Sequence, residues 1–413
     1  MTIAANAIHD SAAAWRRLGV AVLIGTIGSI GMWSFVVALP TVQASFGATR
    51  AEASLPYTMT MVGFAFGGVL MGRLADRFGV VVPLLIGAAA LTTGYLLAAS
   101  ASSLMLYALA QMIVGLGASA SFAPLMADLS HWFVKRRGIA VAIASSGNYL
   151  AGAIWPPIIQ HMLSTYGWRP THVAFGALCL LTLAPLAMLM RKRLPADAGA
   201  SEPPVSRHGA LDLPQNTLLL LLVVAGVACC VAMAMPQVHL VAYCADLGFG
   251  PARGAQMLSI MLAMGVVSRL VSGFVADRIG GLHTLMIGSF LQGVALFLYV
   301  FFDGLSSLFV ISALFGLFQG GIVPMYAVIV REFFPASKAG ATLGIVMMAT
   351  LVGMALGGWI SGFIFDLTGS YGLAFVHGIA WNLVNLAICA FLLWRQRGRG
   401  TVSPARASAG GLR

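Results

Sequence analysis

The sequence predicts an all-α membrane protein with twelve transmembrane helices in two pseudo-symmetric six-helix bundles. Three observations lead to this fold class. The chain is 60% hydrophobic and only 8% charged, whereas soluble domains average about 25% charged residues. Apolar runs of about 20 residues, the length that crosses a bilayer as a helix, recur along the whole chain. Segments of the first half also reappear in the second half at a constant offset.

Twelve apolar runs are separated by mostly short polar connections. The longest polar stretch lies between the sixth and seventh runs and is rich in Pro, Ser and charged residues, as linkers are. We therefore expect an N-terminal six-helix bundle (1–190), a cytoplasmic linker (191–214), a C-terminal six-helix bundle (215–395) and a disordered basic cytoplasmic tail (396–413). The predicted spans are, roughly, 18–40, 52–74, 79–100, 103–127, 138–161, 172–190, 215–243, 254–276, 282–302, 306–330, 339–365 and 372–394.

The two halves repeat each other at an offset of 201 residues. The segment GRLADRFG at 72–79 returns as GFVADRIG at 273–280. Several matches at one offset indicate a duplication of six helices, which is typical of secondary transporters. The same offset relates Phe133 to Phe334, Arg137 to Lys338 and Gly152 to Gly353.

Positive charge determines the predicted orientation. The net charge of +11 could indicate a nucleic-acid partner, but the basic residues form short clusters between apolar runs, as in loops that face an anionic cytoplasmic leaflet. With both termini in the cytoplasm, only Arg50, Arg169 and Arg253 lie outside and Arg269 lies within a span. The other 19 of the 23 Lys and Arg residues face the cytoplasm. We expect both termini to be cytoplasmic and expect no nucleic-acid partner.

The sequence contains no pattern of residues that indicates catalysis or metal binding. The five cysteines lie in or at the ends of apolar runs without metal-ligand spacing, so we expect them to pack as small apolar residues. A membrane-bound transferase or hydrolase would need paired carboxylates or a metal set, and the loops are short. We therefore expect neither an enzyme nor a cofactor.

Arg269 is the residue on which the functional prediction depends. It lies eight residues before Asp277 in an apolar run, which is about 12 Å along a helix. A guanidinium at that depth costs at least about 3 kcal/mol and stays protonated. All twelve acidic residues lie in loops or near predicted helix ends. An anionic substrate bound by the planar guanidinium explains Arg269, while snorkelling or hydrogen bonds to backbone carbonyls are the structural alternatives.

Other polar residues within the spans are candidates for the same binding site. His239, near the outer end of the seventh span, could bind substrate or carry a proton, or could bond to backbone at a helix end. Each remaining candidate would be polar in lipid and is expected to face protein or water, where interhelical hydrogen bonding is the alternative role. These remaining candidates are Tyr57, Asn148, Gln319 and Tyr326.

The segment GRLADRFG resembles the signature loop between helices two and three of the major facilitator superfamily, with Val80-Val81 in place of its basic tail. The resemblance covers the whole chain and implies the major facilitator fold. In this family the loop aspartate, here Asp76, helps to close the cytoplasmic side. We expect a cytoplasmic gate made of Gly72, Asp76, Arg77, Arg136, Arg137 and Asp277.

The segment KRRGIAVAIASSGNYLAGAIWPPIIQHMLSTYGWR at 135–169 resembles the monocarboxylate transporter and oxalate/formate antiporter group. VHLVAYCADLG at 238–248 is similar to bacterial members of that group. Arg269, four residues before Gly273, occupies the place of the group's substrate-binding arginine. The resemblance implies a multi-pass protein of the bacterial inner (plasma) membrane that carries small carboxylates.

The chain departs from that group at three positions. Gly265 stands where human-type monocarboxylate transporters have an aspartate one turn before the arginine. Thr41 stands where they have a lysine, and Thr350 aligns with the lysine of oxalate transporters. The resemblance by itself therefore implies neither the group's proton coupling nor its dicarboxylate recognition for this chain.

These patterns favour a monomeric secondary active transporter that moves a small organic anion, above all a monocarboxylate. Substrate would bind between the halves, and rocking of the halves would give alternating access, with proton symport or anion exchange as the coupling. Efflux of amphiphilic drugs is the first alternative, but it leaves Arg269 unexplained. A non-transporting membrane sensor is the second.

Overall fold

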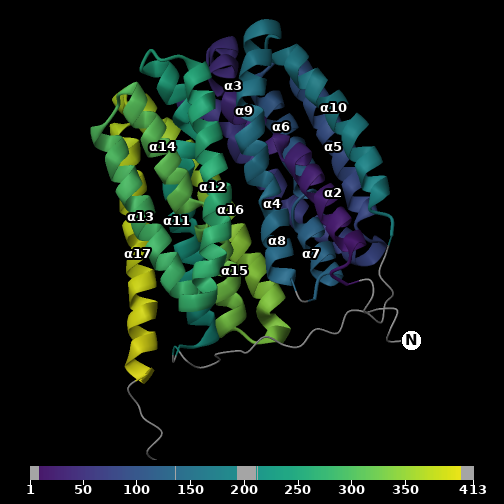
Figure 1. Ribbon diagram of the computed structural model, residues 1–413. Coiled ribbons are helices and arrows are strands. Elements are labelled where there is room, and N and C mark those ends of the chain that lie inside the picture. Colours follow the sequence, from purple (N-terminus) through teal and green to yellow (C-terminus); the bar gives the residue numbers. More distant parts are fainter. Residues whose placement is uncertain (1–8, 135, 193–210, 212, 401–413) are drawn as a thin grey trace, which may run out of the picture.

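The computed structural model describes residues 9–134, 136–192, 211 and 213–400. Every regular element in these residues is a helix, and the helices run roughly parallel to one another in a single bundle (Figure 1). The first half comprises α2 (Ala12–Gly28), α3 (Ile30–Phe46), α4 (Arg50–Phe78), α5 (Val81–Ser100), α6 (Leu104–Ser119), α7 (Ala123–Trp132), α8 (Arg137–Ser145), α9 (Gly147–Tyr166) and α10 (Trp168–Leu189). The second half comprises α11 (Gln215–Asp246), α12 (Pro251–Ile279), α13 (Gly281–Phe301), α14 (Leu305–Gln319), α15 (Ile322–Phe333), α16 (Ala336–Thr368) and α17 (Gly372–Gly400).

The helices repeat as the sequence predicts. Helix α4 and helix α12 have the same length and are offset by 201 residues. Each ends at a glycine with positive φ, Gly79 at 81° and Gly280 at 86°, a conformation that glycine adopts without steric cost. Helices α7 and α15 end at Trp132 and Phe333, and the matched residues Phe133 and Phe334 are their C-caps. The duplication predicted from four sequence matches therefore extends to the helix boundaries.

Several predicted spans are broken helices. The first consists of α2 and α3, which meet at Ser29, and the fifth consists of α8 and α9, which meet at Ser146. The fourth and tenth are interrupted after Ser119 and Gln319. By length and apolar composition, 11 helical stretches of the described chain could cross a membrane. The fifth span, in which α9 contains Pro156 and Pro157, is not among them.

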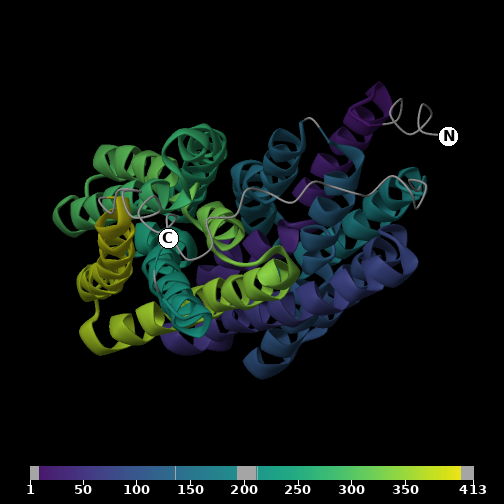
Figure 2. The ribbon, with the colours of Figure 1, turned by 90° about the horizontal axis from the view of Figure 1, so that it is seen from below.

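The bundle has two distinguishable ends. We call the end at which α2 begins and α17 ends the terminal end, and the opposite end, at which α3 ends and α4 begins, the far end (Figure 1). Arg50 begins α4, Asp246 ends α11 and Tyr371 precedes α17, so these three residues lie at the far end. Viewed from the terminal end, the first half (purple to blue) and the second half (green to yellow) lie side by side (Figure 2). Helix α17 runs to Gly400, past the boundary at 395 that composition suggests, and residues 401–413 lie outside the described chain.

Glycines allow close packing of helices within each half. A Cβ atom on Gly63 of α4 would overlap the backbone carbonyl of Met112 in α6. In the second half, a Cβ on Gly316 of α14 would overlap the carbonyl of Met261 in α12. Lipid gives no hydrophobic drive for helices to associate, so backbone approach at small residues is a main source of packing energy.

The two halves pack together at the far end and diverge at the terminal end, as α4 and α16 show. Near the far end, a Cβ on Gly362 of α16 would lie 2.8 Å from the Arg50 carbonyl oxygen, and Thr58 of α4 bonds to the Ala355 carbonyl at 3.2 Å. Toward the terminal end the same helices have open glycines, where a Cβ would meet no atom within 4 Å. These are Gly68 and Gly72 of α4 and Gly340 and Gly344 of α16.

Helix packing at Gly63 can be tested by substitution. Gly63→Ala should lower the free energy of unfolding by about 1–3 kcal/mol, since the new methyl group has to displace backbone. Gly68→Ala, five residues along the same helix, faces open space and should leave stability unchanged or raise it, because alanine is the better helix former. Thermal unfolding in detergent measures both, and an equal loss in the two variants would contradict the close packing of α4 on α6.

Candidate functional site

Arg269 lies in the contact region between the halves. It belongs to α12, ten residues before the helix ends at Ile279, which corresponds to about 15 Å of helix. The residue is only 8% exposed. It faces α8 and α9 of the first half, so residues from both halves surround it.

Backbone carbonyls hold two sides of the Arg269 guanidinium. Nη1 donates to the carbonyl oxygen of Ser145, at the end of α8, and Nε donates to the carbonyl oxygen of Gly320 at 3.3 Å. Both carbonyls lie where a helix is interrupted, so their oxygens are available as acceptors. No carbonyl or carboxylate oxygen of the described residues accepts a hydrogen bond from Nη2.

Tyr149 covers the guanidinium and links it to Gln319. The Arg269 Cζ atom lies 3.9 Å from the centre of the Tyr149 ring, a cation–π contact that is worth more where water is excluded. The Tyr149 hydroxyl donates to Gln319 Oε1 at 3.1 Å. Gln319 is fully buried, and its Nε2 has no hydrogen-bond partner among the described residues. An unpaired buried donor is costly, so this group needs an acceptor.

Gly265 makes room for this arrangement. A Cβ on Gly265 would collide with the edge of the Tyr149 ring. Any larger residue at this place, including the aspartate of human-type monocarboxylate transporters, would have to displace the ring from the guanidinium. No carboxylate of the described chain lies within ion-pair distance of Arg269. In this chain an aromatic face therefore takes the place of a carboxylate beside the cation.

We use the name Arg269 site for Arg269, Tyr149, Gln319 and the carbonyls of Ser145 and Gly320. Arg269 Nη2 and Gln319 Nε2 have no carbonyl or carboxylate acceptor among the described residues, so the site offers hydrogen-bond donors to a ligand. The arrangement is electrostatically suited to an anion with at least two acceptor oxygens. Arg269 is buried within a helix, as its position in an apolar run predicts. It also makes the hydrogen bonds to backbone carbonyls that were the structural alternative to substrate binding.

The other predicted binding residues lie at varied distances from the Arg269 site. Asn148 precedes Tyr149, and its Oδ1 accepts a hydrogen bond from Trp33 at 3.1 Å. Tyr57 packs against Gly358 across the half interface. Tyr326 is completely buried inside the second half, where its hydroxyl donates to Asn385 Oδ1 at 3.2 Å. The structure thus brings Gln319 to Arg269 and keeps Tyr326 within one half.

His239 belongs to a second polar cluster, which lies at the far end. It is fully buried, and its Nδ1 lies 2.9 Å from the Tyr371 hydroxyl while its Nε2 lies 2.7 Å from the Gly358 carbonyl oxygen. The Tyr371 hydroxyl also accepts from Arg50 Nη1 at 2.9 Å, and Arg50 Nη2 donates to Asp246 at 3.0 Å. We call His239, Tyr371, Arg50, Asp246 and Asp366 the far-end latch.

Asp366 supplies the second part of the far-end latch. Its two carboxylate oxygens accept the backbone N–H groups of Arg50 at 2.8 Å and Ala51 at 2.7 Å. These are the first two residues of α4, whose amides have no partner within their own helix. The carboxylate also matches the partial positive charge of a helix N-terminus. A residue of the second half therefore caps a helix of the first half.

The predicted gate residues lie at the terminal end and are open to the surroundings. The side chains of Asp76, Arg77, Asp277 and Arg136 are exposed. Arg136 lies near the Trp15 ring, with Cζ 6.0 Å from the ring centre. Gly72 faces open space, and the Arg137 side chain is outside the described atoms. In this conformation the structure does not bring these residues into contact across the halves.

Sequence reasoning missed Tyr149, Ser145 and most of the far-end latch. It counted Arg50 as an outside loop charge, whereas the structure buries Arg50 to 6% exposure. One signal was available, because an arginine at the first position of a helix opposes the helix dipole and needs a nearby acid. No regular spacing in the sequence links Arg50 to its partners Asp246 and Asp366, and none links Arg269 to the Ser145 carbonyl.

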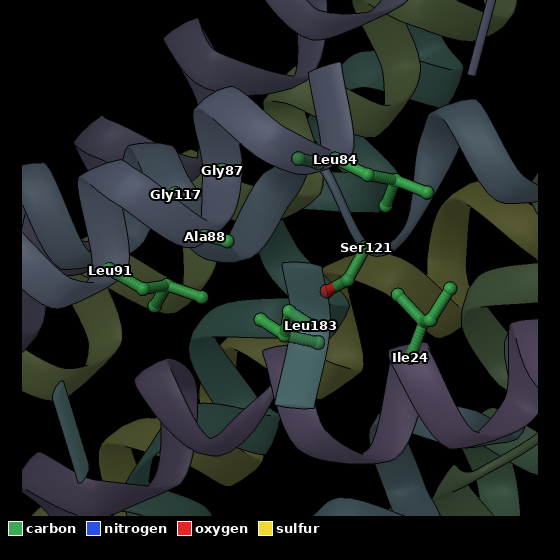
Figure 3. A pocket seen from close by; sticks show the side chains of 9 residues that line it. Ile24, Leu84, Gly87, Ala88, Leu91, Gly117, Ser121 and Leu183 are labelled. Carbon is green, nitrogen blue, oxygen red and sulfur yellow. The ribbon is translucent and has the colours of Figure 1, made fainter. Parts of the chain in front are cut away.

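Two cavities of the described chain lie away from the Arg269 site. A void of about 10 Å³ inside the first half is lined by apolar atoms of α2, α5, α6 and α10, with Ser121 as its one polar side chain (Figure 3). It is at the lower limit for a single water molecule. A surface groove of about 390 Å³ lies between α13 and α14 and has no charged lining residue. Neither cavity fits an ionic substrate.

Comparison with known proteins agrees with this architecture. Monocarboxylate transporter 13 of Bos taurus is 30% identical over 363 residues, which cover 86% of this chain and 83% of that protein. The MFS-type transporter pynF of Aspergillus niger is 29% identical over 331 residues, covering 79% of this chain and 75% of that protein. An agnestins efflux protein of Paecilomyces divaricatus is 24% identical over 351 residues, covering 84% and 79%.

A solved structure shares the fold. It is the crystal structure of a bacterial homologue of the human lysosomal transporter Spinster in an inward-facing and occupied conformation, with a TM-score of 0.70 and 15% identity. The match covers 92% of this chain and 96% of that one. The sequence profile of the Major Facilitator Superfamily matches residues 21–307 and, in a second placement, residues 220–410. The chain is therefore a multi-pass membrane transporter that belongs to the major facilitator superfamily.

Proposed function

We propose that the protein is a secondary active transporter of small organic anions, in particular monocarboxylates, and that the Arg269 site binds the carboxylate. The observation that carries the proposal is a buried cation between the halves that has no carboxylate partner among the described residues and lies near the unpaired Nε2 donor of Gln319. A guanidinium binds a carboxylate through two parallel hydrogen bonds. Here Nε and Nη1 are partly engaged by carbonyls, which leaves the Nη1–Nη2 edge for the substrate.

The packing of the halves supports alternating access. The halves are in contact at the far end and diverge at the terminal end, and we infer that substrate reaches the Arg269 site from the terminal end. The positive-inside pattern favours a cytoplasmic terminal end. In that orientation the described conformation faces the cytoplasm, and the opposite conformation would open the far end by rocking of one half against the other.

A second candidate function is efflux of amphiphilic compounds. Fungal relatives that include a named efflux protein favour it, and so does the satisfaction of two Arg269 nitrogens by backbone carbonyls. A thermal-shift panel on the purified protein separates the two functions. Acetate, propionate, lactate, pyruvate, benzoate and oxalate should be compared with a cationic dye, since a ligand that binds the folded state raises the melting temperature. Stabilisation by the dye alone would favour efflux.

Arg269→Lys should reduce carboxylate uptake at least about tenfold, because the charge remains and the paired hydrogen bonds of the guanidinium are lost. Uptake of the carboxylate that stabilises most in the panel, measured in liposomes, is the readout. Arg253→Lys, an exposed arginine on the same helix at the far end, is the matched control and should transport normally. Uptake by Arg269→Ala within twofold of wild type would exclude the site.

Asp76 is a candidate gate at the terminal end because of a symmetry between α4 and α16. Asp366, the third residue from the end of α16, caps the first residues of α4 at the far end. Asp76 is the third residue from the end of α4, next to the end of the bundle where α16 begins. When the terminal end closes, Asp76 would meet the unpaired amides at the start of α16 in the same way.

Asp76→Asn should slow turnover by about 2- to 30-fold, which corresponds to the loss of a charge–dipole contact, and should leave substrate affinity little changed. Substrate-dependent thermal shifts report affinity, and liposome uptake reports turnover. Asp303→Asn, which removes an exposed carboxylate at the far end, is the control and should leave both turnover and substrate affinity unchanged. Loss of binding with normal turnover of the bound fraction would show that Asp76 is not a gate.

The Arg269 site also predicts a preference for exchange. Without substrate, closing the site leaves a buried cation without an anionic partner, which is expensive. A bound anion neutralises it and should ease the change of conformation. Counterflow of labelled substrate against internal unlabelled substrate should therefore be faster than net uptake into empty liposomes. Equal rates would show that neutralisation of Arg269 does not limit the change.

A further inference from the structure

The hydrogen bonds of the far-end latch run in one direction. The Gly358 carbonyl can only accept, so His239 Nε2 carries a hydrogen, and in the neutral ring Nδ1 is then an acceptor. The Tyr371 hydroxyl must donate to Nδ1, and its oxygen accepts from Arg50 Nη1. Burial raises the pKa of the Tyr371 hydroxyl, so it keeps the hydrogen that it donates. The chain of donors is complete only while His239 is neutral.

A proton on His239 Nδ1 would turn this nitrogen from an acceptor into a donor in its hydrogen bond with the Tyr371 hydroxyl. The Tyr371 hydroxyl would then face two donors, the imidazolium and Arg50, and its own hydrogen would lose its acceptor. Two cations would also share one hydroxyl group inside a dry contact, where like charges repel strongly. The latched arrangement therefore excludes the proton by geometry.

The charged groups around His239 come from three packed helices. Arg50 of α4 and Asp366 of α16 act on the ring electrostatically, and Asp246 of α11 pairs with Arg50. Tyr371 precedes α17 and contributes no charge while protonated. When the halves separate at the far end, Arg50 leaves with the first half, and His239 remains near the Asp366 carboxylate of the second half. The separated state is therefore the one that favours a proton on the ring.

We propose that the far-end latch is a proton-operated lock, in which a proton bound by His239 from the far side holds the far end open and loss of that proton allows closure. The proposal rests on the alternating-access carrier proposed above, because only a protein that opens at the far end exposes His239. It adds a proton site, separate from the Arg269 site, that controls which end of the carrier is open.

The direction and size of the pH effect follow from linkage. An imidazole in water binds a proton near pH 6.5, and the latched state excludes it. The latch is therefore at full strength above about pH 6.5 and weakens as the pH falls below that value. Between pH 7.5 and pH 5.5 the ratio of far-end-open to far-end-closed molecules should rise about tenfold.

The experiment measures that ratio without substrate. Spin labels on Ala44→Cys of α3 and Ala252→Cys of α12, both exposed at the far end, report the distance between the halves in lipid nanodiscs. The five native cysteines are all buried, so a protein without the introduced pair serves as the labelling control. We expect the long-distance population to rise about tenfold, relative to the short-distance one, from pH 7.5 to pH 5.5.

The matched variants are His239→Gln and His172→Gln. His172 is also fully buried between a carbonyl, that of Trp168, and a tyrosine hydroxyl, that of Tyr107, but all three lie within the first half. His239→Gln should change less than twofold between the two pH values, because glutamine cannot take the proton. His172→Gln should keep the wild-type response, so that a general effect of losing a buried histidine is recognised.

Asp366→Asn separates the strength of the latch from its response to protons. It should raise the far-end-open population at both pH values, and that population should still increase from pH 7.5 to pH 5.5, because His239 remains as the group that binds the proton. No pH response in the wild type, or a full response in His239→Gln, would overturn the proposal. Because no substrate is present, these outcomes are independent of whether Arg269 binds a carboxylate, and loss of uptake in Arg269→Lys is equally independent of the latch.

Discussion

Lipid offers no hydrogen bonds, and the polar contacts between the two halves of this protein follow from that constraint. A polar group at the half interface has to find its partner in the other half, in the substrate or in water that enters from one side. In the described chain, the charged residues that contact the other half gather in the Arg269 site and the far-end latch, while Thr58 and Ser259 bond to backbone carbonyls of the other half elsewhere. Because each partner is lost when the halves separate, the same contacts that satisfy polar groups also determine which conformation is stable.

The buried arginines of the far-end latch and of the Arg269 site have different partners. In the latch, Arg50 is paired with Asp246, stacked on Phe365 with Cζ 4.5 Å from the ring centre, and bonded to Tyr371. Its donors are largely used, which suits a contact that closes without a ligand. At Arg269, carbonyls and one aromatic ring hold the cation, and no carboxylate of the described residues neutralises it. A cation held in this way keeps capacity for an external anion, which is what a substrate site requires.

The duplication accounts for the framework but not for these two clusters. Helices α4 and α12, and the glycines that follow them, correspond residue for residue. At the offset of 201, however, Arg50 corresponds to Pro251, which has neither a charge nor a backbone N–H to take part in a latch. The functional asymmetry therefore arises from substitutions on a symmetric scaffold. The antiparallel helices α4 and α16 are related in another way, because each has an aspartate as the third residue from its end.

The sequence alone determined the class of fold and the internal repeat, because apolar length and repeat offset can both be read along the chain. It predicted twelve spans, of which 11 are long and apolar enough in the described chain to cross a membrane, and it predicted a role for Arg269 from the cost of an isolated charge. Tertiary structure alone decided what those charges contact. Arg17, counted as a loop charge, forms a buried ion pair with Asp128 at 2.7 Å, and Arg50 reaches acids 196 and 316 residues away. The breaks at Ser29 and Ser146, the Tyr149 ring over Arg269 and the cap from Asp366 likewise depend on helices that approach each other only in the folded bundle. Spacing along the chain carries no information about such pairs, because hydrogen bonds and ring contacts act over a few ångströms in space.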